Sequence, residues 1–284
     1  MGDNRIGVMI YDNLGLGLLH DTYARILNPF KVYCEKAGYM ISFFNDSPEY
    51  LKECSFVEQA GDMGFCGLFL VYAKYGTDEV EALFDIGLPI VTIGEPHPNA
   101  IAVSSDNGSG IRDLVKYICG ECNHRKVAFI CGDADSIVNK IRLKAFKESC
   151  KEIGIKIPAE YIRQSRFKDI RDVSRRTEEL LNYPDPPTCI IFPDDFAAIG
   201  GINVIHNRGL EVPHDISYCG YDGISVVSHL DPQLTTVVHD TDSMGVTAAQ
   251  KLIDMIREHS VGDGSEITIP TILREGHTVR KMYQ

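Results

Sequence analysis

The sequence predicts an α/β protein in which parallel β-sheets are covered by helices on both faces. Short apolar, β-rich runs alternate with longer helical stretches over most of the 284 residues. The strand-like runs are apolar at consecutive positions, which is typical of strands buried on both faces of a parallel sheet. Repeated strand and helix units of this kind build a layered fold. No low-complexity segment or Pro/Gly/Ser-rich linker divides the chain, so these patterns alone do not reveal a domain boundary.

The first elements follow from local signals. Arg5 to Tyr11 is β-rich and precedes a glycine-bearing loop. A helix is expected from Asp21, a suitable N-cap, to Ala37, with Gly38 ending it. Pro29 lies inside this helix and is expected to kink or split it. The other elements expected up to residue 119 are strands at 39–44, 67–72, 89–93 and 101–104 and helices at 48–63, 77–85 and 106–119.

The alternation continues through the second half and then changes. Thr241 to His259 is expected to form a long amphipathic helix, and Glu266 to Leu273 alternates as an edge strand does. Between residue 119 and this helix, strands are expected at 126–131, 161–164, 189–192, 216–219 and 234–238, and helices at 139–153, 170–182 and 195–208.

Charge and composition exclude several classes of protein. Hydrophobic residues make up 44% of the chain and charged residues 24%, as in ordinary globular proteins. The net charge is −12 and no Lys/Arg-rich block is present. An acidic surface repels a phosphate backbone, so the chain is not expected to bind nucleic acid by itself.

Cysteine usage and the absence of apolar segments predict a compartment. The nine cysteines are an odd number, and several lie inside apolar runs, where a free thiol packs as a small hydrophobic group. This pattern favours a reducing environment over a disulfide framework. No apolar signal segment precedes the first strand and no run is long enough to span a bilayer. We therefore expect a cytoplasmic protein without membrane contact.

One loop stands out as a candidate binding element. Asp222 lies between Gly220 and Gly223, after one β-rich run and before another. Loops at the carboxyl ends of parallel strands face the ligand crevice of an open sheet. An aspartate there can accept hydrogen bonds from a small molecule. The alternative is a turn aspartate that bonds its own backbone.

Several motifs in order resemble those of one family. They are Val103 with Asp106-Asn107-x-x-Gly110, residues 124–130 (HRKVAFI), Arg142-x-x-Ala145-Phe146, Asp194-Asp195-x-Ala197-x-x-Gly200, Pro213-x-Asp215-Ile216-Ser217, Gly220-Tyr221-Asp222 and Pro232-x-Leu234-Thr235-Thr236-Val237. Over nearly its whole length the chain resembles the ligand-binding core of LacI/GalR-type transcriptional regulators, which share the periplasmic sugar-binding-protein fold.

The resemblance implies an architecture. It predicts two Rossmann-like subdomains with parallel sheets, of the periplasmic-binding-protein-like type I, and a ligand cleft between them. The chain would cross between the subdomains near 104–106, 238–240 and 261–265. The expected N-terminal subdomain comprises residues 5–104 and 240–261, and the C-terminal one residues 105–238 and 265–284.

It also implies a binding site centred on Asp222 and Arg142. The matching aspartate of the family accepts hydrogen bonds from sugar hydroxyls, and a carboxylate can bind two vicinal hydroxyls. Arg142 matches a cleft arginine of the family, whose planar guanidinium can pair with a hydroxyl and an acidic partner; the alternative is a solvated helix arginine. Asp194 stands where the family usually has asparagine, which changes the hydroxyl geometry accepted. Of Asp194 and Asp195, one is expected to cap a helix and the other to face the cleft.

Four further residues belong to the predicted site. His239 follows a strand at the second crossing, where the family often has a polar residue, and Phe167 lies where an aromatic ring would stack on a sugar. Tyr11 and Asp12 are expected on the opposite wall. For each of these four a surface or core role is an equal alternative.

No cofactor, metal or catalytic centre is predicted. Cys119-x-x-Cys122-x-His124 lacks the second ligand pair of a structural zinc site. Gly15-x-Gly17 lacks the third glycine of a dinucleotide loop, and phosphate-binding, nucleophile-elbow and zinc-protease motifs are absent from the sequence. We therefore do not expect an enzyme.

The leading hypothesis is an effector-sensing core of a LacI-type regulator. A small ligand, a sugar or related polyol, would close the cleft of a homodimer, and a helix-turn-helix headpiece that is absent from this sequence would bind operator DNA. One alternative is an extracytoplasmic sugar-binding protein of a transport system. Another is a sensor for a different output domain. The sequence does not specify the ligand, its action as inducer or corepressor, or the operator.

Overall fold

A computed structural model describes residues 4–11 and 17–283, which divide into two compact units. The first unit comprises the described residues of Met1–Ser105 together with Asp240–Ile269, and the second those of Asp106–His239 together with Pro270–Gln284. The chain therefore passes between the units three times. The third passage lies between Ile269 and Pro270, later than the expected 261–265, and residues 265–269 belong to the first unit.

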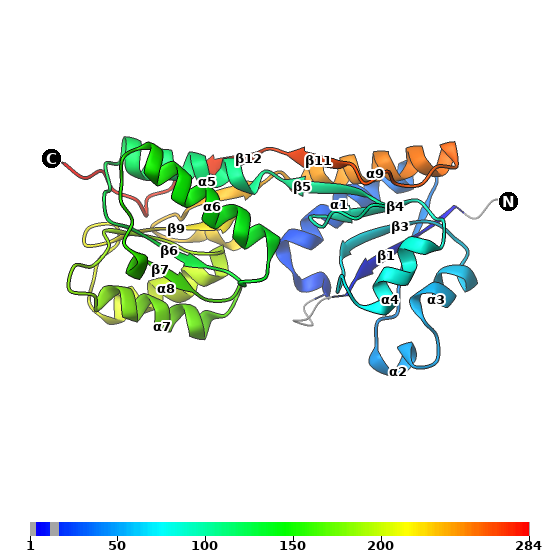
Figure 1. The fold of residues 1–284 in the computed structure, drawn as a ribbon, viewed down its shortest axis with the longest axis horizontal. Helices are drawn as coiled ribbons and strands as arrows, with labels where there is room; N and C mark the ends of the chain where they lie inside the picture. The colour runs from blue at the N-terminus through cyan, green and yellow to red at the C-terminus, as the bar shows by residue number, and fades with distance from the viewer. Residues whose placement is uncertain (1–3, 12–16, 284) are drawn as a thin grey trace. The chain divides into compact units, whose positions relative to one another are not determined.

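The first unit is built on a six-stranded sheet with the order β11-β5-β4-β3-β1-β2. Every neighbouring pair in this sheet is parallel, as the consecutive apolar positions predict. Figure 1 shows these strands among the helices of the unit. The strands are β1 (Arg5–Ile10), β2 (Met40–Phe43), β3 (Phe65–Tyr72), β4 (Ile90–Ile93), β5 (Ile101–Ser105) and β11 (Glu266–Ile269).

Helices cover both faces of this sheet, each over its own apolar cluster. On one face α1 (Asp21–Lys36) and α9 (Thr241–Glu258) pack on side chains that include Ile6, Val8 and Phe69. Neighbouring strand residues such as Met9 and Leu68 point to the other face, because successive side chains of a strand alternate. That face carries α2 (Pro48–Leu51), α3 (Phe56–Asp62), α4 (Asp78–Glu81) and the 3₁₀ turn Ala82–Asp85, and a further 3₁₀ turn spans Gly17–Leu19.

Two helix predictions of this unit need correction. α1 runs from Asp21 to Lys36 without a break at Pro29, and its N-cap is His20 instead of Asp21. The helix expected at 48–63 is two helices. The second begins at a capping box in which the Ser55 hydroxyl accepts from the Glu58 N–H and the Glu58 carboxylate accepts from the Ser55 N–H. This arrangement starts a new helix.

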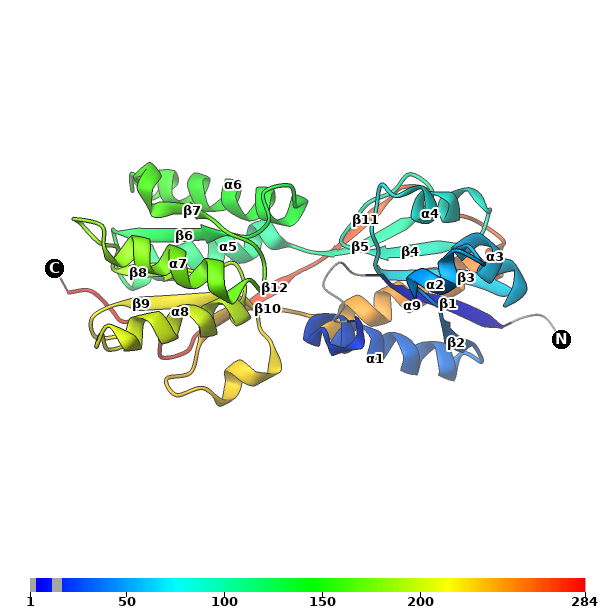
Figure 2. The same cartoon turned by 90° about the horizontal axis from the view of Figure 1, so that it is seen from below.

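The second unit repeats the strand order of the first. Its six-stranded sheet has the order β12-β10-β9-β8-β6-β7, which can be followed in Figure 2. All neighbouring pairs are parallel except β10 and β12, which are antiparallel. The strands are β6 (Val127–Cys131), β7 (Ile162–Gln164), β8 (Cys189–Ile191), β9 (Ser217–Asp222), β10 (Thr235–His239) and β12 (Thr271–Arg274).

Its helices also form two layers. Val127 and Phe129 of β6 face α5 and α6, whereas Ala128 and Ile130 face α7 and α8. Figure 1 shows these two helix pairs on opposite sides of the sheet. The elements are α5 (Asn107–Val115), which continues as a π-helix over Lys116–Glu121, α6 (Ile137–Glu152), α7 (Ile170–Leu181), α8 (Asp195–Asn207) and the 3₁₀ turns Ala159–Tyr161 and Ser225–His229.

The expected edge strand from Glu266 to Leu273 is two strands in two sheets. β11 pairs with β5 of the first unit, and β12 pairs with β10 of the second. Only Pro270 separates them, so the alternating pattern continues from one sheet into the other. Within the described residues, no helix is both long and apolar enough to cross a membrane.

Candidate functional site

The candidate site lies in the second unit, at the carboxyl ends of its central strands. Asp222 is the last residue of β9 and His239 the last of β10, while Asp194 and Asp195 begin α8 just after β8. Arg142 reaches the same place from α6. The carboxyl ends of parallel strands are where α/β sheets bind ligands, and this sheet places five ionisable side chains there.

The backbone holds Asp222 in an unusual conformation. Its φ is 101°, in the region that residues with a side chain rarely adopt. Gly223 follows with φ 66°, and a Cβ added to it would lie 2.7 Å from Val238 Cγ2. An aspartate at positive φ costs on the order of 1–3 kcal/mol, and such strain is concentrated at functional sites. The glycine allows the chain to turn sharply, and the turn holds the carboxylate at the strand end.

Arg142 is buried and uses its donors on three partners. Its Nε donates to Asn107 Oδ1 at 2.8 Å and one terminal nitrogen to the Pro193 carbonyl at 2.9 Å. The other terminal nitrogen lies 3.4 Å from Asp222 Oδ1. The guanidinium carbon also lies 3.5 Å from the centre of the Tyr221 ring, a cation–π arrangement. Arg142 is therefore fixed in place beside Asp222, and the alternative of a solvated helix arginine is wrong.

His239 gives Asp222 its second contact. His239 Nε2 lies 3.2 Å from the same oxygen, Asp222 Oδ1. Burial raises the pKa of Asp222, but the His239 hydrogen bond and the positive charge of Arg142 outweigh it, so the pKa is lowered overall. Asp222 is consequently ionised at neutral pH. No described residue donates a hydrogen bond to its second oxygen, Oδ2, which keeps its acceptor capacity.

Asp194 and Asp195 are both turned into the protein. Asp194 caps α8 by accepting from the Ala197 N–H at 2.8 Å, and its second oxygen accepts from the Lys168 N–H at 2.8 Å. Asp195 accepts from the Thr236 hydroxyl at 2.6 Å and the Ile224 N–H at 2.9 Å. The exposed fraction is 1% for Asp194 and 0% for Asp195. One of the two does cap the helix, but the other is completely buried.

Burial and charge repulsion shift both of these carboxyls in one direction. Burial, followed by the negative charge of Asp222, raises the pKa of Asp194 to about 6. The same two causes raise the pKa of Asp195. Asp222 thus stays charged because Arg142 and His239 contact it, whereas its two acidic neighbours have backbone and hydroxyl donors only.

Phe167 lies next to the cluster of Asp222, Arg142 and His239. A Cβ at Gly132 would overlap the Phe167 ring, so the ring packs directly on the backbone after β6. The Phe167 N–H donates to Asp133 Oδ2 at 3.2 Å, and its ring centre lies 5.9 Å from the Arg142 guanidinium carbon. The ring is half-buried, which leaves part of it accessible to a ligand.

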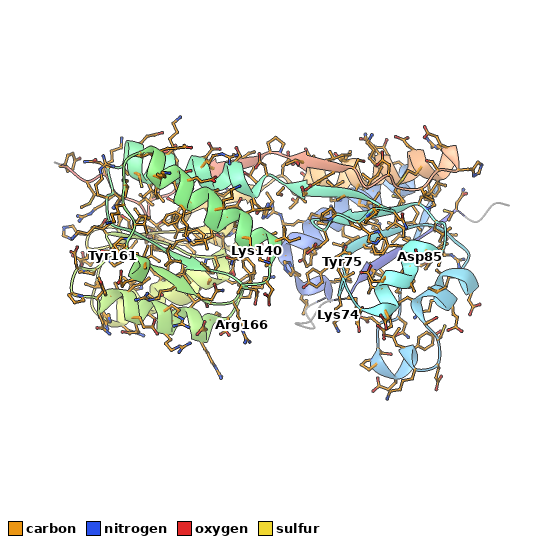
Figure 3. All side chains as sticks on the ribbon, viewed as in Figure 1. Lys74, Tyr75, Asp85, Lys140, Tyr161 and Arg166 are labelled. Carbon is orange, nitrogen blue, oxygen red and sulfur yellow. The ribbon has the colours of Figure 1, made fainter. Side chains whose placement is uncertain are left out.

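The first unit holds the other predicted residues. Tyr11 follows β1, its N–H donates to the Tyr72 carbonyl at 2.9 Å, and the Lys74 ammonium lies 3.8 Å from its ring centre. Asp12 lies outside the described residues. Tyr75, labelled with Lys74 in Figure 3, was not among the predicted site residues. Its hydroxyl oxygen is buried without a hydrogen-bond partner in the described chain. Its position after β3, at a carboxyl strand end, was the available signal.

The histidine of the Cys-x-x-Cys-x-His motif, His124, has a structural role. Nδ1 of His124 bonds to the Thr188 hydroxyl at 2.8 Å and Nε2 to the Arg280 carbonyl at 3.0 Å. Burial lowers the pKa of His124 to about 4, so the ring is neutral. Over the described parts of the chain, no group of three or more His, Cys, Asp or Glu side chains is arranged to hold a metal ion.

Comparison with known families identifies the family of this chain. The model of the periplasmic binding protein-like domain matches residues 120–279, which is more than half of the chain. The chain belongs to the family of periplasmic binding protein-like domains. The predicted fold class and the relationship to the LacI/GalR regulators are confirmed.

Named relatives connect the family to transcription. The HTH-type transcriptional repressor CytR of Escherichia coli K12 is 25% identical over 259 residues, covering 90% of this chain and 75% of the repressor. A LacI-family regulatory protein from Chloroflexus aggregans has a similar structure, with TM-score 0.83, 21% identity and coverage of 97% and 98% of the two chains. The transcriptional regulator CelR in complex with cellobiose is also similar, with TM-score 0.83, 21% identity and coverage of 97% and 84%. The named relatives are transcriptional regulators.

Proposed function

We propose that this chain is the effector-sensing core of a LacI-type transcriptional regulator and that its effector is a small polyhydroxylated molecule, a sugar or related polyol. The observation that carries the proposal is the ionised Asp222, held at positive φ with one oxygen bonded to Arg142 and His239 and the other available. A carboxylate of this kind accepts charge-assisted hydrogen bonds from hydroxyls. The CelR complex shows that a regulator of similar fold binds a sugar.

Each residue of the proposed site has a separate role. Asp222 accepts hydroxyl hydrogen bonds, and Arg142 and His239 keep it charged and oriented. Phe167 offers the accessible part of its ring to the apolar face of a sugar. Asp194, at 1% exposed, supports the site by fixing the Lys168 backbone and the start of α8. A contact of Tyr11 and Asp12 with the same ligand stays a prediction.

The proposal includes the partners and the location of the protein. Effector binding would be coupled to operator DNA through a separate headpiece, since the chain with its net charge of −12 is not suited to binding DNA itself. We also propose that the protein is a cytoplasmic homodimer without enzymatic activity. Sedimentation of the purified chain would measure its oligomeric state.

Thermal unfolding with a panel of sugars, sugar phosphates and nucleosides tests the function. A ligand at about 100 times its Kd adds roughly 2.7 kcal/mol to the free energy of unfolding, which raises Tm by several degrees. Asp222→Asn removes the charge with little change of shape and should weaken binding about 10- to 100-fold, because it deletes charge-assisted hydrogen bonds. Glu152→Gln, which neutralises an exposed carboxylate of the same unit, is the control and should bind as wild type does.

The outcomes separate the site from the function. A Tm increase in wild type and Glu152→Gln that is lost in Asp222→Asn would support both. A compound that raises Tm equally in all three proteins would contradict the assigned site. A panel in which only non-hydroxylated compounds bind would contradict the polyol class.

A further inference from the structure

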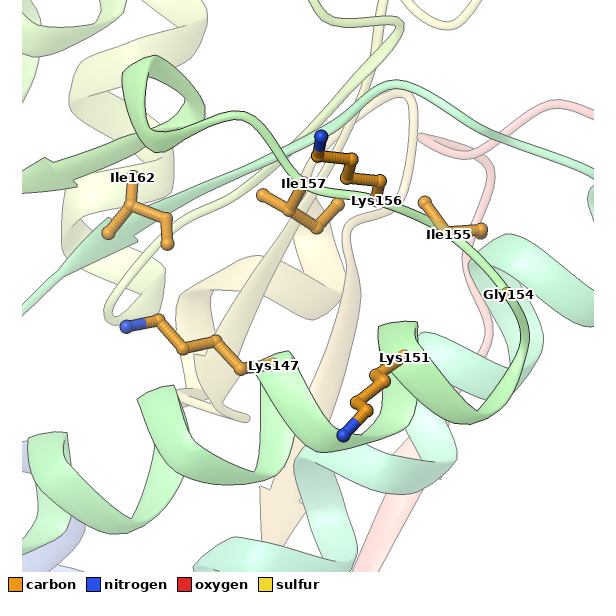
Figure 4. A pocket seen from close by; sticks show the side chains of 7 residues that line it. All are labelled: Lys147, Lys151, Gly154, Ile155, Lys156, Ile157 and Ile162. Carbon is orange, nitrogen blue, oxygen red and sulfur yellow. The ribbon is translucent and has the colours of Figure 1, made fainter.

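A groove on the second unit lies outside the candidate site. It runs along the C-terminal half of α6 and under the segment that leads to β7, and its volume is about 440 Å³. Figure 4 shows it from close by. A volume of this size suits a small organic ligand. Its lining residues are Lys147, Lys151, Gly154, Ile155, Lys156, Ile157 and Ile162.

The apolar part of the groove is aliphatic. Ile155 is buried, and Ile157 and Ile162 are partly buried against the same apolar cluster under α5 and α6. Gly154 adopts a φ of 78° and turns the chain at the end of α6, which brings Ile155 and Ile157 back along the helix. β7 is the last strand of its sheet, so Ile162 lies at an open edge. Isoleucine side chains therefore form the apolar part of the lining, with Ile157 and Ile162 partly exposed and Ile155 buried.

Its polar part consists of cations that no acid neutralises. Lys147, Lys151 and Lys156 are exposed, and none forms an ion pair with any described residue. On the same helix Lys144 does pair with Glu148, at 3.9 Å. The chain has 40 acidic and 28 basic residues, whereas the charged side chains that line this groove are all lysines.

The lysines are not equivalent. In Figure 4 the Lys147 side chain extends toward Ile162, whereas Lys151 points away from the segment above the helix. The Lys147 charge also acts on Cys131, the last residue of β6, where burial raises the thiol pKa to about 11 and Lys147 opposes that increase. Of the three lysines, Lys147 is the one whose side chain extends toward β7.

The side chains that line the groove determine which kind of ligand it can bind. The lining side chains include no aromatic ring that could stack on a base or sugar, no acceptor for hydroxyls and no arginine fork for a phosphate. They combine an aliphatic surface with point charges. We propose that this groove binds a medium-chain alkyl carboxylate, with its tail on the partly exposed Ile157 and Ile162 and its carboxylate at Lys147. This site is independent of the polyol site at Asp222.

The affinity should depend on both the length of the alkyl tail and the charge of the carboxylate. Burial of one methylene corresponds to about fourfold in affinity when it is complete, so an open groove should give about two- to fourfold for each added methylene. An exposed ion pair contributes up to about fivefold. Octanoate should accordingly bind about fivefold more tightly than octanamide, which has the same tail without the charge.

Calorimetric titration of the whole chain with butyrate, hexanoate, octanoate and decanoate tests the proposal. Kd should fall along this series. Lys147→Gln should weaken octanoate binding about fivefold, Lys151→Gln and Lys156→Gln less. Lys140→Gln is the matched control, since Lys140 lies on the same helix outside the groove (Figure 3) and its loss should leave Kd unchanged. Asp222→Asn should also bind octanoate as wild type does.

Three results would overturn the assignment. They are a Kd that does not change with chain length, equal affinities for octanoate and octanamide, and equal effects of Lys147→Gln and Lys140→Gln. Ile157→Thr, with its fold checked by thermal unfolding, provides a second variant. It should weaken decanoate binding more than butyrate binding, because only the longer tail covers the isoleucines.

Discussion

The two units share one strand order but differ at the edge where α/β sheets bind ligands. In the second unit, the strand ends carry a charged group of Asp222, Arg142 and His239 with two buried aspartates behind it. In the first, the corresponding ends carry Tyr11, Lys74 and Tyr75. One topology thus presents two kinds of chemistry, which shows that strand order does not determine the contents of a site.

The units also match where the chain leaves them. Asp106 follows β5 and caps α5 by accepting from the Ser109 N–H, and Asp240 follows β10 and caps α9 by accepting from the Ser243 N–H. Each of these helices belongs to the unit that did not supply the preceding strand. Gly110 is the fourth residue of α5 and Gly245 the fifth of α9, and both pack too tightly for a side chain.

The largest expected difference between the units comes from these two glycines. A Cβ at Gly245 would overlap the Ile26 carbonyl oxygen and lie 3.0 Å from the Phe30 nitrogen, so the backbone of α1 would have to move. A Cβ at Gly110 would meet only side chains, those of Tyr221, Thr271 and Val237. Overpacking costs about 1–3 kcal/mol. We expect Gly245→Ala to lower the free energy of unfolding by about 2–3 kcal/mol and Gly110→Ala by about 1 kcal/mol, as measured in urea.

The order of these two values is the decisive result. Helix propensity favours alanine equally at both positions, so it does not alter their difference. Equal losses would show that α1 adjusts as easily as the side chains around Gly110.

A smaller difference in stability is expected between substitutions at the first residues of α8 and α4, the helices that follow equivalent strands of the two sheets. Asp195 begins α8 and is 0% exposed, and Asp78 begins α4 on the surface. Asp195→Ala removes the partner of the Thr236 hydroxyl and the Ile224 N–H. A buried group left without a partner costs about 1–3 kcal/mol. We expect the substitution to lower the free energy of unfolding, measured in urea, by about 2 kcal/mol, because the lost hydrogen bonds outweigh the relief of no longer burying a carboxyl group.

Asp78→Ala is the control in the other unit. A surface substitution of this kind should change the free energy of unfolding by less than about 0.5 kcal/mol. Similar losses for both variants would contradict the structural role assigned to Asp195.

The smallest effect concerns pH. The pKa of Asp194 is raised from 3.8 to about 6, so the folded protein binds a proton more tightly than the unfolded chain does. Asp194 therefore adds stability as pH falls from 7 to 5, by about 1 kcal/mol, and this gain is lost as pH rises through 6. Asp194→Asn keeps a capping side chain and should lack the gain.

The quantity to measure is the difference in unfolding free energy between wild type and Asp194→Asn at pH 5 and at pH 7. The variant loses the bond to the Lys168 N–H at both pH values, so this loss is a constant. The pKa of Asp222 is lowered, which places its titration below this range. A difference that does not change with pH would contradict the raised pKa of Asp194.

Periodicity predicted most elements, because it reports how local side chains meet a buried sheet. It did not report which sheet a strand joins. Residues 266–273 alternate without interruption, yet Pro270 divides them between two units. The break after Leu51 was readable, since Ser55 and Glu58 have the spacing of a capping box. Pro29, which suggested a break, lies in a continuous helix because tertiary packing outweighs a local preference.

The sequence predicted which residues form the site better than it predicted the contacts between them. Motif resemblance selected Asp222, Arg142 and His239, which the structure brings together. The complete burial of Asp195 was not predictable, because it depends on Thr236, which is 41 residues away. The need for glycine at position 220 was unpredictable for the same reason. A Cβ at Gly220 would overlap Asp195 Oδ1, so the glycine allows a close approach of Asp195 that no local pattern shows.

The three passages of the chain between the units affect how such a protein can be rearranged. Ser105 adjoins Asp106, His239 adjoins Asp240 and Ile269 adjoins Pro270, with no connecting residues in between. Neither unit is therefore encoded by one continuous stretch of the gene. Exchange of a whole unit with that of a relative would need several recombination breakpoints, whereas changes at the strand ends need only point mutations. New ligand specificities should thus be reached by substitution within both halves more readily than by shuffling them.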